Sequence, residues 1–219
     1  MSDHSGRARY EHIGGVYDAL SLERWLYRRP RQRLHDLLGP RPGATIVDAG
    51  CGTGLNFDGL RRLVGPSGRV IGVDASRSML AAAGRRAKGA GWDNVQTLQG
   101  DIEDLTSALE RSGIQLSEID AVIATFVVST LRDPTSFWRC VDETIAAQPC
   151  LVIALADIGH ADEARRIPAL ALNAFAALGG NQRRSRPWND LAERASNVRT
   201  ERHLGGHIHL TVGHCKPHS

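Results

Sequence analysis

The sequence predicts an α/β fold built on an open, mostly parallel β-sheet. From Pro42 onward, short apolar runs alternate with helical patterns, which is typical of successive βα units. The first run leads directly into a glycine-rich segment, and the chain closes with two alternating runs around a glycine pair. A length of 219 residues, with 42% hydrophobic and 23% charged residues, favours one globular domain with a substantial core.

Five runs rich in β-branched and apolar residues are the expected parallel strands. They are Ala44–Ala49, Arg69–Asp74, Asn94–Leu98, Ile119–Thr125 and Cys150–Ala156. Helical patterns separate them, at Leu55–Val64, Ser76–Lys88, Ile102–Arg111 and Pro134–Ala147. Ser76 is the expected N-cap of its helix, because the apolar positions begin three residues later.

The two flanks of this repeat have different patterns. Residues 16–38 are expected to be helical, broken at Pro30, and to precede the first strand without joining the sheet. Residues 161–178 form a long alanine-rich helical pattern, followed by a short helix around residues 188–195. The runs 198–204 and 207–212 flank Gly205-Gly206 and predict an antiparallel hairpin.

Composition excludes several other classes of protein. No apolar run approaches the ~18 residues of a membrane span, and the first residues contain no apolar segment of a signal peptide. Four scattered cysteines form neither a zinc ribbon nor a disulfide framework. Residues 1–43 carry eight arginines against five acidic residues, and the remaining charges balance, which is too small an excess for a nucleic-acid footprint. We therefore expect a cytoplasmic protein without a nucleic-acid partner.

A glycine-rich segment follows the first expected strand and carries the strongest functional signal. It has the sequence Val47-Asp-Ala-Gly-Cys-Gly-Thr-Gly-Leu-Asn56. Glycine allows positive φ and a close approach of the backbone to a ligand, and ligands of open α/β sheets lie at such strand ends. A dinucleotide site would require glycine or alanine at the position of Leu55. A ligand without a pyrophosphate group therefore fits this spacing better.

Acidic residues follow the next two strands at the same edge of the sheet. Asp74 ends the second strand, and a carboxylate there can accept hydrogen bonds from both ribose hydroxyls of an adenosine. Gly100-Asp101-Ile102 follows the third strand, where the acid can accept from an adenine amine. The backbone N–H of Ile102 would then serve a ring nitrogen.

Taken together, the segments VDAGCGTG, GVDAS, GDIEDL and IDAVIATFVVSTLRDP resemble the class I S-adenosylmethionine-dependent methyltransferases in order and spacing. The resemblance implies a Rossmann-like seven-stranded, mostly parallel sheet with helices on both faces and an antiparallel C-terminal strand. It implies that Asp48, Gly50, Gly52 and Gly54 hold the methionine moiety, Asp74 the ribose, and Asp101 and Ile102 the adenine. Thr125 would line the pocket near the sulfonium. The implied cofactor-binding set is completed by Cys51, Ala75, Met79 and Gly100.

The resemblance also implies how the chain is organised and what it does. One methyltransferase domain (1–219) would comprise a helical cap (1–38), a cofactor-binding core (43–157), a helical insertion (158–197) and a C-terminal hairpin (198–214). The branch that it is most similar to contains ubiquinone and menaquinone methyltransferases and bacterial phospholipid N-methyltransferases. A small molecule or lipid is the expected acceptor. An NAD(P)-dependent oxidoreductase and a non-catalytic S-adenosylmethionine-binding protein stay open as alternatives.

Residues for the acceptor are expected outside these motifs. Tyr17, Asp157 and His160 are the catalytic candidates, because the first precedes the core and the others follow the fifth strand. The basic and aromatic stretch 24–33 could contact anionic lipid headgroups or a phosphorylated acceptor, although a solvated helix face is the preferred interpretation. His207 and His209 lack a further ligand at a matching spacing, so we expect the polar face of a hairpin and no metal.

Overall fold

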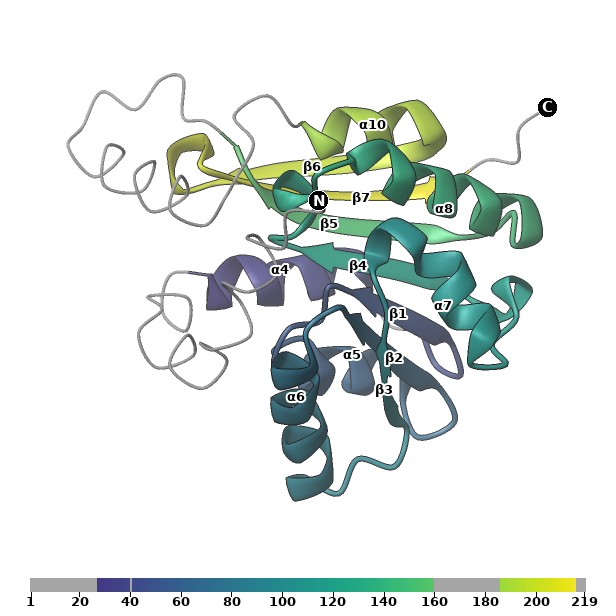
Figure 1. Cartoon of the computed structure of the whole chain (residues 1–219). Helices are drawn as coiled ribbons and strands as arrows, with labels where there is room; N and C mark the ends of the chain where they lie inside the picture. The colour runs from purple at the N-terminus through teal and green to yellow at the C-terminus, as the bar shows by residue number, and fades with distance from the viewer. Residues whose placement is uncertain (1–26, 40, 160–185, 216–219) are drawn as a thin grey trace, which may run out of the picture.

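A computed structural model of the chain describes residues 27–39, 41–159 and 186–215. They form a seven-stranded sheet with the order β3-β2-β1-β4-β5-β7-β6 (Figure 1). The strands are β1 Thr45–Ala49, β2 Arg69–Asp74, β3 Val95–Gln99, β4 Ala121–Thr125, β5 Val152–Ile158, β6 Ala195–His203 and β7 Ile208–Cys215. β1 to β5 pair in parallel, whereas β7 is antiparallel to both of its neighbours. The predicted α/β fold is confirmed.

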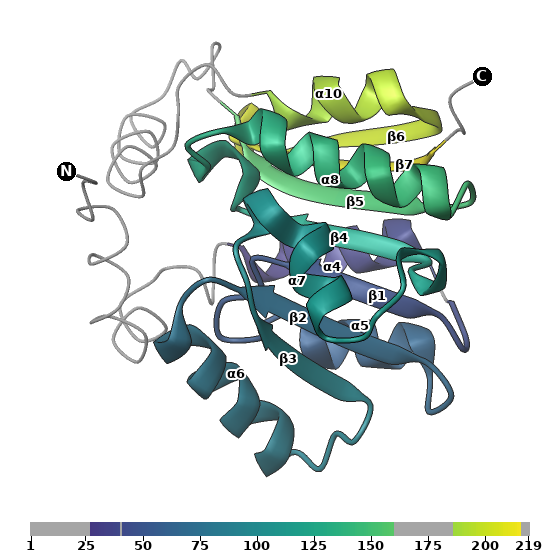
Figure 2. The same cartoon turned by 45° about the vertical axis from the view of Figure 1, so that its right-hand side comes forward.

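Helices cover both faces of the sheet. The structure contains α4 Arg28–Leu38, α5 Phe57–Val64, α6 Arg77–Gly89, α7 Leu105–Arg111, α8 Pro134–Ala147 and α10 Pro187–Arg194. Short 3-10 turns occur at η1 Ile102–Asp104, η2 Leu116–Glu118, η3 Val128–Thr130 and η4 Leu204–Gly206. Figure 2 shows α7 and α8 on the near side of the sheet and α4 and α5 behind it.

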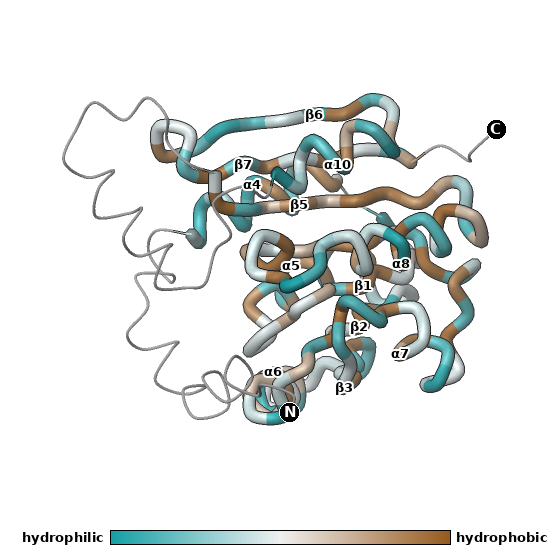
Figure 3. The backbone as a smooth tube through the Cα atoms, turned by 45° about the horizontal axis from the view of Figure 1, so that its top comes forward, coloured by the Kyte–Doolittle hydropathy of each residue, from teal (hydrophilic) through white to brown (hydrophobic). Residues whose placement is uncertain are grey.

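Alternation along the strands divides the core into two layers. Ile46 and Ile123 pack with the apolar sides of α4, α5 and α6. Val47 and Val122, their immediate neighbours along the two strands, pack with α7, α8 and α10 on the opposite face. Both faces of the central strands are therefore buried, as expected for a parallel sheet. In Figure 3 the tube is brown along β5 and largely teal or white along the edge strand β6.

The expected helix break at Pro30 is wrong. Helix α4 begins at Arg28, and Pro30 lies inside its first turn. A proline is tolerated there because the first backbone N–H groups of a helix have no intrahelical acceptor. The rest of α4 buries Leu34 and Leu38 against the sheet, so this part of the expected cap is an element of the core.

The expected polar face of the C-terminal hairpin is also wrong. His207 and His209 are 1% and 9% exposed, and β7, which begins between them at Ile208, lies inside the sheet. The ring of His209 stacks on Trp188 of α10, with centroids 3.9 Å apart. No helix in the described part of the chain is long and apolar enough to cross a membrane.

Candidate functional site

The glycine loop joins the carboxyl end of β1 to α5 and leaves open space in front of its middle residue. Gly50, Gly52 and Gly54 all have left-handed backbone conformations, with φ values of +70°, +54° and +77°. A Cβ on Gly50 would lie 2.7 Å from the side chain of Val127, so this glycine permits packing inside the protein. A Cβ on Gly52 would meet no described atom within 4 Å. Only Gly52 of these two therefore borders a space that a ligand could fill.

Asp74, at the end of β2, fixes the glycine loop. Its Oδ2 accepts a hydrogen bond from the backbone N–H of Gly52 at 2.8 Å, and its Oδ1 accepts one from Ser76 at 2.9 Å. Burial raises the pKa of Asp74, and these two backbone N–H groups oppose that rise. A carboxylate oxygen can accept more than one hydrogen bond, so Asp74 can hold the loop and still accept from a ligand.

A buried polar network joins β1, α5 and β4 beside the loop. Asp48 Oδ1 accepts a hydrogen bond from Asn56 Nδ2 at 2.8 Å, and the same nitrogen lies 3.1 Å from Thr125 Oγ1. Asp48 is fully buried, and its Oδ2 has no hydrogen-bond partner among the described residues. Burial raises the pKa of Asp48 to about 7. A buried carboxylate oxygen without a donor indicates that a ligand group can complete this network.

Helix α4 adds a cation, Arg31, which the sequence patterns marked only as part of the basic stretch 24–33 and did not place at the cofactor site. Arg31 Nη1 donates to Asn56 Oδ1 at 2.9 Å and to Thr125 Oγ1 at 2.7 Å. Its guanidinium lies 5.4 Å from the ring centroid of Phe126. His35, one turn further along α4, contacts Asn56 Oδ1 at 3.2 Å, and its pKa is lowered to about 4, mainly by burial. Arg31, His35 and Asn56 are therefore candidate site residues that motif matching did not assign.

The remaining expected cofactor residues lie around the same edge of the sheet but differ in their local structural roles. Asp101 caps η1 by accepting from the N–H of Glu103 at 3.1 Å, while the side chain of Ile102 is buried in the core. Met79 is 7% exposed in the first turn of α6, and Ala75 is exposed. A Cβ on Gly100 would lie 2.6 Å from Ala108.

One thiol and one carboxyl group near the site, those of Cys51 and Asp157, are buried and have raised pKa values. Burial raises the pKa of the Cys51 thiol far above its ordinary value, so this thiol stays protonated. Asp157 is 2% exposed and accepts hydrogen bonds from the hydroxyl and backbone N–H of Ser129 and from the N–H of Ile158. Burial raises its pKa despite these donors. Tyr17 and His160, the other two catalytic candidates, lie outside the described residues.

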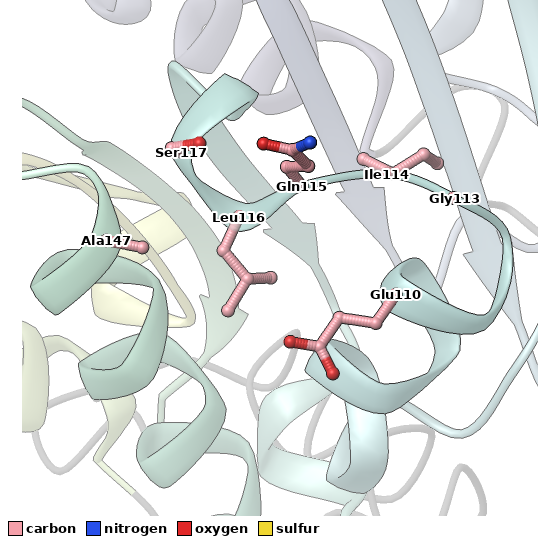
Figure 4. A pocket seen from close by; sticks show the side chains of 7 residues that line it. All are labelled: Glu110, Gly113, Ile114, Gln115, Leu116, Ser117 and Ala147. Atoms are coloured by element: carbon pink, nitrogen blue, oxygen red, sulfur yellow. The ribbon is translucent and has the colours of Figure 1, made fainter.

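A separate hollow lies far from this edge. It has a volume of about 500 Å³ and is lined by residues from the end of α7, η2 and the end of α8 (Figure 4). These segments lie at the amino ends of the strands, opposite the glycine loop, and ligands of open α/β sheets bind at the carboxyl ends. The described residues contain no group of three or more His, Cys, Asp or Glu side chains that could hold a metal ion.

Comparisons with known proteins agree with this geometry. The sequence profile of a methyltransferase domain family matches residues 40–174. A nocamycin O-methyltransferase of Saccharothrix syringae is 36% identical over 95 residues, which are 43% of this chain and 33% of that protein. A demethylmenaquinone methyltransferase of Bacillus cytotoxicus is 32% identical over 101 residues, 44% of this chain and 41% of that protein. Such matches span less than half the length of these relatives.

Solved structures show the same fold at low sequence identity. A SAM-dependent methyltransferase from Aquifex aeolicus has a TM-score of 0.60 and 19% identity, covering 84% of this chain and 88% of that one. DhpI in complex with SAH has a TM-score of 0.63 and 21% identity, covering 96% and 95%.

Proposed function

Because the chain belongs to the class I S-adenosylmethionine-dependent methyltransferases, we propose that it transfers a methyl group from S-adenosylmethionine to a small-molecule or lipid acceptor and releases S-adenosylhomocysteine. The observation that carries the proposal is the space in front of Gly52, bordered by polar groups at the carboxyl ends of β1, β2 and β4. S-adenosylmethionine supplies an electrophilic methyl group there when it is bound.

The residues present fit this cofactor. The buried Asp48 Oδ2 can accept from the ammonium of the methionine moiety, and Arg31 can donate to its carboxylate. Asp74 can accept from the ribose hydroxyls, and Asp101 from the adenine amine. The site thus offers acceptors for each donor of the cofactor and a cation for its carboxylate.

The protein's main contribution would be to position the reactants. Alignment and exclusion of water can suffice for such a transfer, so a general base is optional. Tyr17 and His160 stay candidates for acceptor binding. Asp157 is better suited to a positioning role than to a chemical one. Its carboxylate accepts two hydrogen bonds from Ser129 and so holds the η3 turn beside the site.

The relatives support a small-molecule acceptor, since their names include an O-methyltransferase and a menaquinone-pathway enzyme. A lipid acceptor stays part of the proposal. The alternative of an NAD(P)-dependent oxidoreductase receives no support from the glycine loop, because Leu55 occupies the position that would need glycine or alanine.

The test is cofactor turnover by matched glycine variants. Gly52→Val should lower S-adenosylmethionine affinity by about 100-fold, equivalent to about 2.7 kcal/mol, because the side chain fills the ligand space. Gly65 also has positive φ, at +67°, and open surroundings, but lies between α5 and β2 away from the site. Gly65→Val should therefore bind like the wild type.

Release of S-adenosylhomocysteine from the wild-type protein, incubated with candidate acceptors, separates an enzyme from a silent binder. Equal cofactor affinity in both glycine variants would overturn the assignment of the site.

A further inference from the structure

The helices on the two faces of the sheet carry opposite charge. α4, α5 and α6 contain ten Arg or Lys residues, four on α4, two on α5 and four on α6, against Asp36 and Asp58. α7, α8 and α10 contain three basic and five acidic residues. The net charge of the whole chain is only +3, so this separation is a property of the fold. The molecule therefore presents one strongly basic face, which we call the α4–α6 face.

Several charged side chains on this face form no ion pair within the described part of the chain. Arg28 and Arg29 of α4 and Arg85 and Lys88 of α6 are exposed and form no ion pair with a described residue. By contrast, the exposed arginines on the other face have acidic neighbours, as Arg139 has Glu143 at 2.6 Å and Arg111 has Asp104 at 3.5 Å. Like charges that have no ion pair within the described part of the chain repel one another, so they are available for an anionic partner.

We propose that the α4–α6 face docks the protein on an anionic lipid bilayer. The basic residues spread over three helices that lie against the sheet, which suits a broad, featureless anionic surface. Each Lys or Arg near such a surface contributes about 1 kcal/mol to adsorption. The acidic α7, α8 and α10 face points away from the bilayer in this orientation, so both faces favour the same pose.

The features that nucleic acids require are weaker on this face. The apolar sides of α4, α5 and α6 are buried against the sheet, so these helices offer charges for phosphate contacts but few apolar groups for contacts with bases. Leu204, on the β6–β7 hairpin, is the exposed large hydrophobic residue among those described, so an aromatic platform for stacking bases is missing there. The contact with lipid would accordingly be electrostatic and salt-sensitive, without insertion.

The orientation also brings the functional edge to the membrane. Arg28 and Arg29 lie in the first turn of α4. Arg31, two residues after Arg29 on the same helix, contacts Thr125 at the site. An acceptor with a polar group at the bilayer surface would therefore reach the site from the rim of the contact. This second step rests on the proposed methyl transfer, whereas the docking itself does not.

The test is sedimentation of the full chain with vesicles of phosphatidylcholine, with and without phosphatidylglycerol, in the absence of cofactor. We expect binding only to the anionic vesicles and its loss at high salt. Arg28→Gln/Arg29→Gln and Arg85→Gln/Lys88→Gln should each weaken binding about 25-fold, at about fivefold for each charge. Arg111→Gln/Arg139→Gln removes the same charge from α7 and α8 on the opposite face and should bind like the wild type.

Gly52→Val should also bind vesicles normally, which separates failure of docking from failure of the proposed function. The proposal is overturned if the anionic vesicles do not bind, if the two faces respond equally to charge removal, or if a transfer RNA binds in preference to the vesicles at the same salt concentration. Circular dichroism melting of each variant confirms that it is folded.

Discussion

Arg31 links helix α4 to the candidate site through side-chain hydrogen bonds. It donates to Asn56 and Thr125, which lie 25 and 94 residues away along the chain. Contacts of this kind depend on the tertiary fold and leave no periodicity or spacing in the sequence. Asp48 and Asp74, in contrast, could be predicted because each lies in the last two residues of a strand, next to a recognisable loop.

Replacing Arg31 with Gln should selectively weaken ligands that carry the methionine carboxylate. A hydrogen bond to a charged group contributes about 1.5–3 kcal/mol, so S-adenosylhomocysteine affinity should fall by about one to two orders of magnitude. 5′-Methylthioadenosine lacks the carboxylate, and its affinity should stay within about twofold. Arg33→Gln, two residues further along α4 and paired with Glu201 at the surface, is the control for calorimetry. Equal losses for both ligands would place Arg31 in a purely structural role.

Asp48 should give the protein a distinctive pH dependence of stability. Burial raises its pKa from 3.8 to about 7 in the folded protein, so between these values the folded state binds more protons than the unfolded state. The contribution of Asp48 to the free energy of unfolding therefore falls as pH rises from 4 to 7, by up to about 1.4 kcal/mol per pH unit.

Asp48→Asn removes this titratable group, so the difference in stability between the variant and the wild type reports on Asp48 alone. The variant should gain stability relative to the wild type as pH rises from 4 to 7, as measured by urea unfolding at several pH values. The other buried acids, Asp74 and Asp157, titrate in both proteins and cancel in the difference. A difference that does not change with pH would mean that Asp48 is ionised at low pH in the folded protein.

Among the elements, the sequence predicted the repeat of strands and helices better than their ends. Arg69–Asp74 and Pro134–Ala147 match their predicted bounds, because a sharp change of pattern or an Asp-Pro start marks each end. The fourth and fifth strands begin two residues later than expected, at Ala121 and Val152. Apolar residues that precede these strands are buried in turns, and hydrophobicity alone does not distinguish a buried turn from a strand.

Helix α4 should behave as part of the core. Leu34 is fully buried beneath the sheet, so Leu34→Ala should cost about 2–5 kcal/mol in the free energy of unfolding. Leu204 is 43% exposed, and Leu204→Ala should change stability by less than about 0.5 kcal/mol. Denaturant unfolding of both variants makes the comparison. A small effect at Leu34 would show that α4 is an appendage, as the sequence had suggested for residues 1–38.

At the scale of the whole molecule, the strand order explains why distant residues share one site. β1 lies between β2 and β4, so the chain continues in opposite directions from β1. This is the switch point at which open α/β sheets have their ligand crevice. Asp48 is the next-to-last residue of β1, and Asp74 and Thr125 are the last residues of β2 and β4, so the three side chains lie at this end of neighbouring strands. The order itself could be expected only through resemblance to a known family, because strand pairing is not written in local sequence patterns.

Cofactor binding should therefore stabilise the whole domain, since the ligand would contact elements from three strands at once. A ligand that binds only the folded state adds about 2.7 kcal/mol at 100 times its dissociation constant. For a domain of this size, that corresponds to a rise in Tm of about 5–10 °C. We expect this rise with S-adenosylhomocysteine in a thermal unfolding assay, and none with NAD, because Leu55 stands where a dinucleotide loop needs glycine or alanine. Gly52→Val should lose the shift and Gly65→Val should keep it. A comparable shift with NAD would instead assign the crevice to a dinucleotide and would contradict a methyltransferase site.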